Sequence, residues 1–211
     1  MSDRERADAA RNRQAILDAA STLFDAAADP MAVTMEDVAA AAGVGKGTLF
    51  RRFGDRGGLL RAVFRTRIAA LSAAVETGPP PLGPGTPAPE RITAVLDAIV
   101  QVKLSHPQLT HALEHLEQRA DRGSLFDSPA YQGAHALFTE LLGDVAGDRA
   151  SWIAHVLLSL TRIDLIEHMV SAEGWTGQQV RDRIRRLAEQ ILQADGAAGT
   201  AATCPFPEPT G

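Results

Sequence analysis

Four cations and two aromatic side chains lie close together in the segment GVGKGTLFRRFGDR, residues 43–56. Lysine and arginine side chains bind the phosphate oxygens of nucleic acids, and an exposed aromatic ring can contact a thymine methyl group. The glycines indicate a turn and positions where a backbone can approach a ligand closely. The segment therefore predicts a surface that binds DNA, with the cations Lys46, Arg51, Arg52 and Arg56.

The distribution of charge agrees with a local DNA-binding surface. The chain carries a net charge of −5, which argues against a packaging protein that coats nucleic acid without regard to sequence. Residues 1–67 hold eleven Lys and Arg against nine Asp and Glu, a net charge of +2, so residues 68–211 carry −7. The surplus of basic residues therefore lies in the part of the chain that contains residues 43–56.

Helix signals surround the segment. Ile16 to Phe24 follow a helical period, Thr34 is a natural N-cap with Asp37 three residues later, and Gly43 ends a short second helix. A third helix is expected from residues 45 or 46 to 54, and Asp55 can cap a fourth that reaches residue 76. Two short helices joined by a glycine turn predict a helix-turn-helix, whose second helix enters the major groove.

The third helix is expected to have an apolar and a cationic face. At about 100° per residue, Leu49 and Phe53 point inward, whereas Gly47 and Arg51 point outward. Gly47 costs roughly 1 kcal/mol of helix stability relative to Ala, which is tolerable where the backbone must approach DNA. Hydroxyl contacts with phosphates are expected from two residues, Thr34 and Thr48.

The stretch TMEDVAAAAGVGKGTLFRRFGDRGGLLRAVF resembles the DNA-binding domain of the tetracycline-repressor-like (TetR) family of bacterial transcription regulators, from about Ile16 to Phe64. The resemblance implies base contacts from three residues of the recognition helix, Lys46, Gly47 and Phe50. It implies phosphate contacts from Thr48, Arg51, Arg52 and Arg56. Two features depart from the family: Phe50 stands where many members carry Tyr, and the pair Gly57 and Gly58 stands at a helix start.

The remainder of the chain predicts further helices. The Pro/Gly-rich segment 77–90 is expected to be a loop between two regions, and helical patterns follow at about 90–106, 107–119, 128–147, 149–172 and 177–194. We therefore predict an all-α fold of about nine helices. The expected division is a DNA-binding domain at 1–76, a linker at 77–90, an effector-binding and dimerisation domain at 91–195, and a disordered tail at 196–211.

The family implies a homodimer and a small-molecule effector bound in the second domain. Residues 149–172 carry more apolar surface than one core face needs, which independently favours a dimer. The expected interface comprises Trp152, Leu157, Leu160, Val180, Ile184 and Leu187. The expected effector pocket comprises His111, His115, Phe126, Tyr131, Phe138 and Arg162.

An alternative function is an all-α metal-dependent enzyme that uses His111 and His115, which are four residues apart on one helix face. The stretch HALEH lacks the glutamate placement of the HExxH zinc motif, and the only cysteine, Cys204, lies in the predicted tail. We therefore expect no metal, no cofactor and no catalytic residues.

The expected function is that of a cytoplasmic, homodimeric transcriptional regulator, a repressor released from a palindromic operator by an effector. No segment is apolar for long enough to predict a membrane span. A minor-groove role for the N-terminal arginines, Arg4, Arg6, Arg11 and Arg13, is left open against a disordered, solvated arm.

Overall fold

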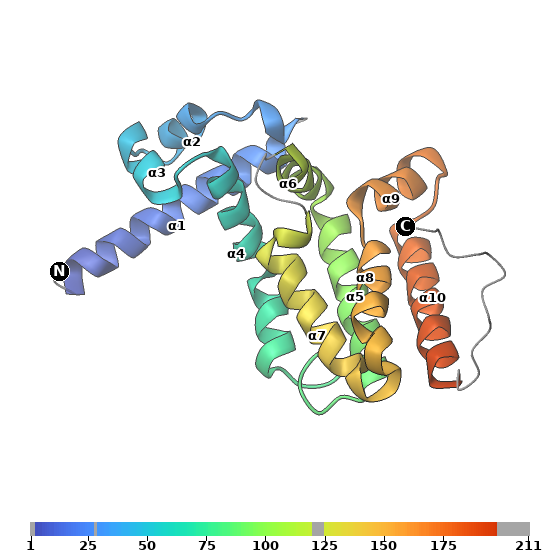
Figure 1. The fold of residues 1–211 in the computed structure, drawn as a ribbon. Helices are drawn as coiled ribbons and strands as arrows, with labels where there is room; N and C mark the ends of the chain where they lie inside the picture. The colour runs from blue at the N-terminus through green and yellow to red at the C-terminus, as the bar shows by residue number, and fades with distance from the viewer. Residues whose placement is uncertain (1–2, 28, 120–124, 198–211) are drawn as a thin grey trace, which may run out of the picture.

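The computed structural model describes residues 3–27, 29–119 and 125–197, and every regular element in these ranges is helical (Figure 1). The all-α prediction is therefore confirmed. The α-helices are α1 Asp3–Ala26, α2 Met35–Ala41, α3 Lys46–Phe53, α4 Arg56–Thr77, α5 Ala88–Ser105, α6 Pro107–Arg119, α7 Pro129–Ala146, α8 Ala150–Ser159, α9 Ile163–Glu167 and α10 Gly177–Ala197. Short 3₁₀ turns lie at Pro30–Ala32, Leu125–Asp127 and Gly147–Arg149, and a π-helical segment at His168–Ala172 follows α9. The end of the predicted tail, with Cys204, lies outside the described residues.

Helices α1 to α4 enclose the first hydrophobic core. Its fully buried side chains include Ile16 and Phe24 of α1, Leu49 of α3 and Leu60 of α4. The N-terminal part of α1 continues past this core and projects from the molecule in Figure 1. The first residues therefore form a helix from residue 3 onward, where the sequence left a disordered arm open.

Helix α6 inserts into the same core. Leu109 is 2% exposed and Ala112 is 1% exposed, and both pack with the buried residues of α1 and α4. Helix α4 leads from this core into the Pro/Gly-rich loop and is one connection between the two regions. The structure adds α6 as a second connection, because a helix from beyond the Pro/Gly-rich loop completes the core of the N-terminal region.

The remaining helices form two further clusters. One joins α5, α7, α8 and α10 through side chains such as Leu96, Phe138, Leu157 and Ala188. The other joins α5, α9 and α10 through Val100, Ile166, Val180 and Ile184. Helix α5 thus contributes to both clusters and is central to the larger region.

The Pro/Gly-rich loop between α4 and α5 is held by one arginine. Arg91 donates from Nε to the carbonyl oxygen of Leu82 at 2.8 Å and from Nη2 to that of Val75 at 2.7 Å. The Thr86 hydroxyl, which is buried, donates to the Gly83 carbonyl oxygen at 3.0 Å. The loop is therefore fixed to the end of α4.

The single helix predicted over 149–172 is wrong. The chain leaves helical geometry at Arg162, which has ψ 133°, so that α8 ends at Ser159 and α9 begins at Ile163. The buried carboxylate of Glu114 accepts from the Ile163 N–H at 3.4 Å and from Lys103 Nζ at 2.5 Å. This partner on α6 is far away in sequence, which explains why local periodicity did not reveal the break.

Candidate DNA-binding surface and ligand groove

Two local features build the helix-turn-helix. The Thr34 hydroxyl accepts from the Asp37 N–H at 3.1 Å, and the Asp37 carboxylate accepts from the Thr34 N–H at 2.9 Å. This capping box confirms the predicted start of α2 and holds the pKa of the Asp37 carboxyl below its usual value through hydrogen bonds from Thr34. Gly43 has φ +65°, the left-handed conformation that ends α2 and turns the chain toward α3.

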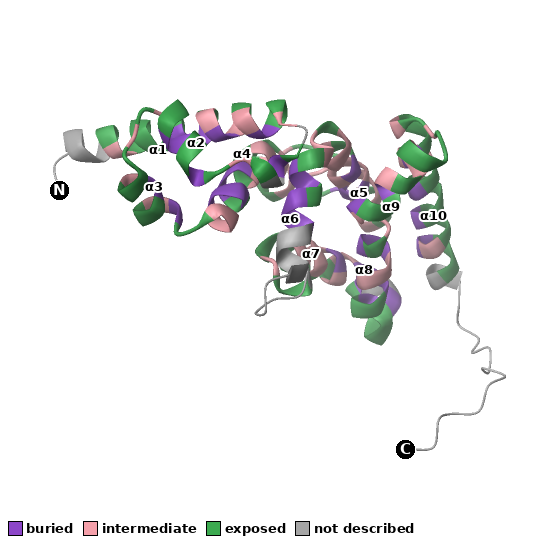
Figure 2. Cartoon of the chain, turned by 90° about the horizontal axis from the view of Figure 1, so that it is seen from above, coloured by how far each residue is buried: buried purple, intermediate pink, exposed green. Residues whose placement is uncertain are grey.

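Helix α3 has the two faces that the sequence predicts. Leu49 is 0% exposed and Phe53 is 9% exposed, so both anchor α3 in the core. On the outside, Phe50 is 40% exposed, and a Cβ atom at Gly47 would meet nothing within 4 Å. Figure 2 shows α3 at one edge of the molecule.

Lys46 begins α3 and is held above the exposed aromatic ring. Its ammonium group forms an ion pair with Glu36 of α2 and lies 5.9 Å from the centroid of the Phe50 ring. The hydrogen bond from Lys46 lowers the pKa of the Glu36 carboxyl. Lys46, Gly47 and Phe50, the three residues predicted to contact bases, are therefore neighbours on one exposed surface.

The residues of α3 and α4 that are predicted to contact phosphates differ in their surroundings. Arg51 is exposed on the outer face of α3, and Thr48 is half-buried. Arg52 instead donates from Nη1 to the Ala9 carbonyl oxygen at 2.8 Å, and Arg56 donates from Nη2 to the Pro30 carbonyl oxygen at 2.9 Å. Burial lowers the pKa of the Arg56 guanidinium. These two arginines have structural partners inside the N-terminal region, a use that their sequence positions did not reveal.

Gly58, the second glycine of the unusual pair at the start of α4, has a geometric explanation. Asp55 caps α4 by accepting from the Gly58 N–H at 2.7 Å, as predicted. A Cβ atom at position 58 would lie 2.0 Å from the Phe53 carbonyl oxygen, so only glycine fits there. Gly58 therefore permits the sharp turn between α3 and α4.

The N-terminal arginines that the structure describes lie on α1. Arg13 places its guanidinium 5.1 Å from the centroid of the Phe53 ring, and Arg11 pairs with Asp8. The side chains of Arg4 and Arg6 lie outside the described residues. Arg13 thus stacks on the aromatic residue that anchors the end of α3.

Of the predicted effector-pocket residues, the structure brings Phe126 and Tyr131 into contact but does not gather the six into one pocket. Phe138 is fully buried in the core, whereas Arg162 pairs with Asp164 at 2.6 Å near the surface. Tyr131 lies against His155, with its hydroxyl 2.6 Å from Nδ1, and the Phe126 ring packs edge-on at 5.1 Å between centroids. His111 lies 3.9 Å from Glu167, and the side chain of His115 is outside the described residues.

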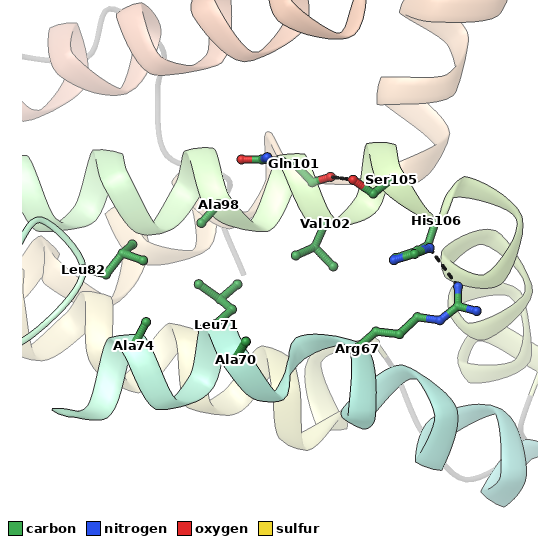
Figure 3. Close-up of a pocket in the computed structure, with 10 residues that line it drawn as sticks. All are labelled: Arg67, Ala70, Leu71, Ala74, Leu82, Ala98, Gln101, Val102, Ser105 and His106. Atoms are coloured by element: carbon green, nitrogen blue, oxygen red, sulfur yellow. Dashed lines mark hydrogen bonds between the residues drawn. The ribbon is translucent and has the colours of Figure 1, made fainter. Parts of the chain in front are cut away.

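A groove of about 370 Å³ lies elsewhere, between α4 and α5 (Figure 3). Ala70, Leu71 and Ala74 of α4 face Ala98 and Val102 of α5, and the loop residue Leu82 closes one end. Arg67 and His106 lie at the other end, with Gln101 and Ser105 on the α5 side. Small residues on the facing sides of α4 and α5 leave this space. The sequence could have predicted the groove only if the packing of α4 against α5 had been known.

The described ranges contain neither a metal-binding cluster nor a membrane-spanning helix. Within the described ranges, no group of three or more His, Cys, Asp or Glu side chains is placed to hold a metal ion. No helix in those ranges combines the length and apolar character that a membrane span needs.

The structure revises the predicted dimer interface. Leu157, Val180 and Ile184 lie within the protomer core at 0%, 0% and 6% exposure, so their side chains are not available to a partner. Leu160 is half-buried between the two C-terminal clusters. Trp152 of α8 and Leu187 of α10 are exposed, at 69% and 42%. Periodicity identified the apolar positions but could not tell the inner face from the outer one.

The geometry defines an all-α protein with an N-terminal helix-turn-helix and a larger helical region. Residues 16–63 match the family described as "Bacterial regulatory proteins, tetR family". The HTH-type transcriptional repressor LfrR of Mycolicibacterium smegmatis is 42% identical over 82 residues, which cover 39% of this chain and 42% of LfrR. The match thus spans less than half of the length of that relative.

Solved structures resemble nearly the whole chain. A TetR transcriptional regulator from Rhodococcus sp. RHA1 has a TM-score of 0.61 at 20% identity and covers 88% of this chain and 97% of its own. A TetR-like regulator from the same source has a TM-score of 0.57 at 21% identity and covers 86% and 96%. Residues 16–63 thus match the N-terminal region of the tetR family of regulatory proteins, and the solved structures show that the whole chain shares the fold of TetR-like regulators.

Proposed function

We propose that this protein is a homodimeric transcriptional regulator that binds a palindromic operator and represses transcription until a small molecule releases it. The outer face of α3 carries the proposal, because Lys46, Phe50 and Arg51 are exposed while Leu49 and Phe53 anchor the helix. An anchored helix with a cationic outer face is what major-groove recognition requires.

The proposed contacts follow from this arrangement. Lys46, Gly47 and Phe50 face the base edges, with Phe50 offering only apolar contact because it has no hydroxyl. Arg51 and Thr48 bind phosphates. Arg52 and Arg56 hold α1 and the turn before α2 against this surface through their hydrogen bonds to Ala9 and Pro30, and any phosphate contact they make is in addition to that role.

The exposed side chains of Trp152 and Leu187 support a homodimer through α8 and α10. Two recognition helices about 34 Å apart read two half-sites one helical turn apart. We propose residues 1–76 as the DNA-binding domain, 77–90 as the linker and 91–195 as the effector-binding and dimerisation domain, with α4 and α6 coupling the two domains. Effector control requires a ligand with different affinities for the DNA-binding and released states.

The test is selection of bound duplexes from a random DNA pool by the purified full-length protein, at a stated salt concentration. We expect enrichment of a palindrome whose half-sites are one helical turn apart. Recovery of no preferred sequence by a folded protein contradicts the proposal. An Arg51→Ala variant, which alters the outer face alone, provides the matched control for binding through α3.

A further inference from the structure

One arginine joins three parts of the molecule. Arg67 of α4, whose side chain is 9% exposed, donates from Nη2 to Ser21 Oγ at 2.6 Å and to Asp25 Oδ2 at 2.7 Å, both on α1. From Nη1 it donates to Nδ1 of His106, at 2.8 Å, where α5 ends. A single guanidinium therefore connects the first helix of the N-terminal region to the corner between α5 and α6.

The same guanidinium lies at the polar end of the groove. A guanidinium only donates hydrogen bonds, so Nδ1 of His106 accepts and the proton of the neutral ring is on Nε2. In Figure 3 this second ring nitrogen points toward the groove. The rest of the groove is mostly apolar, with Leu71, Leu82 and Val102 along its length. The groove thus offers hydrogen-bond donors and positive charge at one end of an apolar trough.

We propose that this groove binds an amphipathic carboxylate, with its apolar chain between α4 and α5 and its carboxylate on Arg67 and the Nε2–H of His106. The volume of about 370 Å³ lies in the range of small-molecule sites. The inference rests on the proposed function only in naming this ligand as the effector. Binding itself is independent of DNA.

The contacts of Arg67 also indicate how the ligand acts. A bound carboxylate and Asp25 are chemically equivalent partners, so both compete for one guanidinium. The side chain of Asp25 is 56% exposed, and its ion pair is therefore weakened by solvent, whereas a ligand carboxylate at this end of the groove accepts from both Arg67 and the Nε2–H of His106. Ligand binding draws Arg67 away from Asp25 and Ser21 and loosens the link to α1. Because the coupling is reciprocal, a substitution that weakens the bonds from Arg67 to α1 must strengthen ligand binding.

Direct titration of the full-length protein tests the ligand class. The probes are octanoate, dodecanoate and hexadecanoate, with the alcohol of each chain length, all below their micelle-forming concentrations. We expect calorimetry to detect saturable binding of at least one carboxylate, about tenfold or more tighter than its alcohol. Binding of none of the three, or equal binding of the alcohol, overturns the proposal.

Two pairs of variants locate the site. Arg67→Met should weaken carboxylate binding about tenfold or more, whereas Arg65→Met, an exposed arginine on the same helix, should not. Because Arg67→Met also cuts the link to α1 and can impair folding, Ala98→Phe fills the groove without touching that link. It should abolish binding, and Ala73→Phe on the exposed side of α4 should leave binding unchanged. Normal binding to a folded Ala98→Phe variant places the ligand elsewhere and overturns the assignment.

A further variant tests the competition between Asp25 and the ligand for Arg67. Asp25→Asn removes the competing carboxylate, so it should raise the affinity for the bound carboxylate several-fold and lower the affinity for the selected operator without ligand. Unchanged ligand affinity overturns the competition. If the ligand binds but no operator is found, the proposed function fails and the site stands; if the operator binds but the groove takes no carboxylate, the site fails and the function stands.

Discussion

Arg52 and Ala9 are 43 residues apart in sequence and are joined by a hydrogen bond of 2.8 Å from Nη1 to the carbonyl oxygen. The bond ties the projecting helix α1 to the last turn of α3. Its neighbour Arg51 points outward from the same turn and is exposed. Adjacent arginines in one motif therefore have different surroundings, and this difference can be measured.

We expect Arg51→Ala to weaken operator binding and leave stability unchanged, because the side chain is exposed and is proposed to contact a phosphate. The slope of log affinity against log salt should fall by about 1, the loss of one phosphate contact. Arg52→Ala should instead lower the free energy of unfolding by about 1 kcal/mol through loss of the bond to Ala9. Operator titrations and urea unfolding of both variants distinguish the two roles. A destabilised Arg51→Ala protein contradicts the outward placement.

The core position of Leu49 gives a prediction for stability. Leu49 is fully buried, so Leu49→Ala should cost about 2–5 kcal/mol of unfolding free energy through lost burial and the cavity left behind. Phe50→Ala, one residue later on the exposed side, should change stability by about 0.5 kcal/mol or less while weakening operator binding. Chemical denaturation measures both, and equal stability losses refute the assigned faces of α3.

The two glycines Gly47 and Gly58 should respond in opposite ways to alanine. A Cβ atom at position 47 meets nothing within 4 Å, so Gly47→Ala should stabilise α3 by about 0.5–1 kcal/mol while hindering approach to DNA. At position 58 the new atom would lie 2.0 Å from the Phe53 carbonyl oxygen, so Gly58→Ala should destabilise the protein. Thermal unfolding of the pair checks this. A stable Gly58→Ala variant shows that the turn after α3 can open without cost.

Local patterns predicted the N-terminal region well because its signals are local. The capping box at Thr34, the cap at Asp55 and the inward positions of Leu49 and Phe53 all depend on residues within a few positions of each other. The charge of Arg52 and Arg56 predicted phosphate contacts. Their hydrogen bonds to Ala9 and Pro30 could not be predicted, because these partners are distant in sequence.

The larger region was less predictable because its features depend on helix pairing. The break after α8 involves Glu114, which lies 49 residues from Ile163, and no local residue marks it. The groove depends on small residues of α4 facing α5 across the loop, and periodicity cannot establish that pairing. Apolar periodicity likewise predicted both Leu157 and Trp152 at the dimer interface, although Leu157 is buried and Trp152 is exposed.

Acidification should weaken the fold through His106. Burial and the adjacent charge of Arg67 lower the pKa of His106 below 6.5, against an opposing effect of Asp25. The unfolded chain therefore takes up the proton at a higher pH than the folded chain, so this contribution to stability is complete above about 6.5 and declines as the pH falls through the folded pKa. Protonation also removes the Nδ1 acceptor that Arg67 uses.

We expect the native protein to lose more unfolding free energy between about pH 7.5 and pH 5.5 than His106→Gln does. Urea unfolding at both pH values measures the difference. Burial also lowers the pKa of His155, which contributes equally to the pH dependence of the native protein and of His106→Gln. Stopping at about pH 5.5 avoids most of the titration of carboxylates. An identical pH dependence of the two proteins contradicts the inferred state of His106.

The dimer proposal is tested by two leucines of equal exposure. Leu187 on α10 and Leu165 on α9 are both 42% exposed, but only Leu187 lies on the proposed interface. Leu187→Glu places a charge where the partner must exclude water, so sedimentation at micromolar concentration should show a shift from dimer to monomer. Leu165→Glu should sediment as the parent does. If both variants remain dimeric and bind the operator unchanged, the partner does not cover Leu187 of α10.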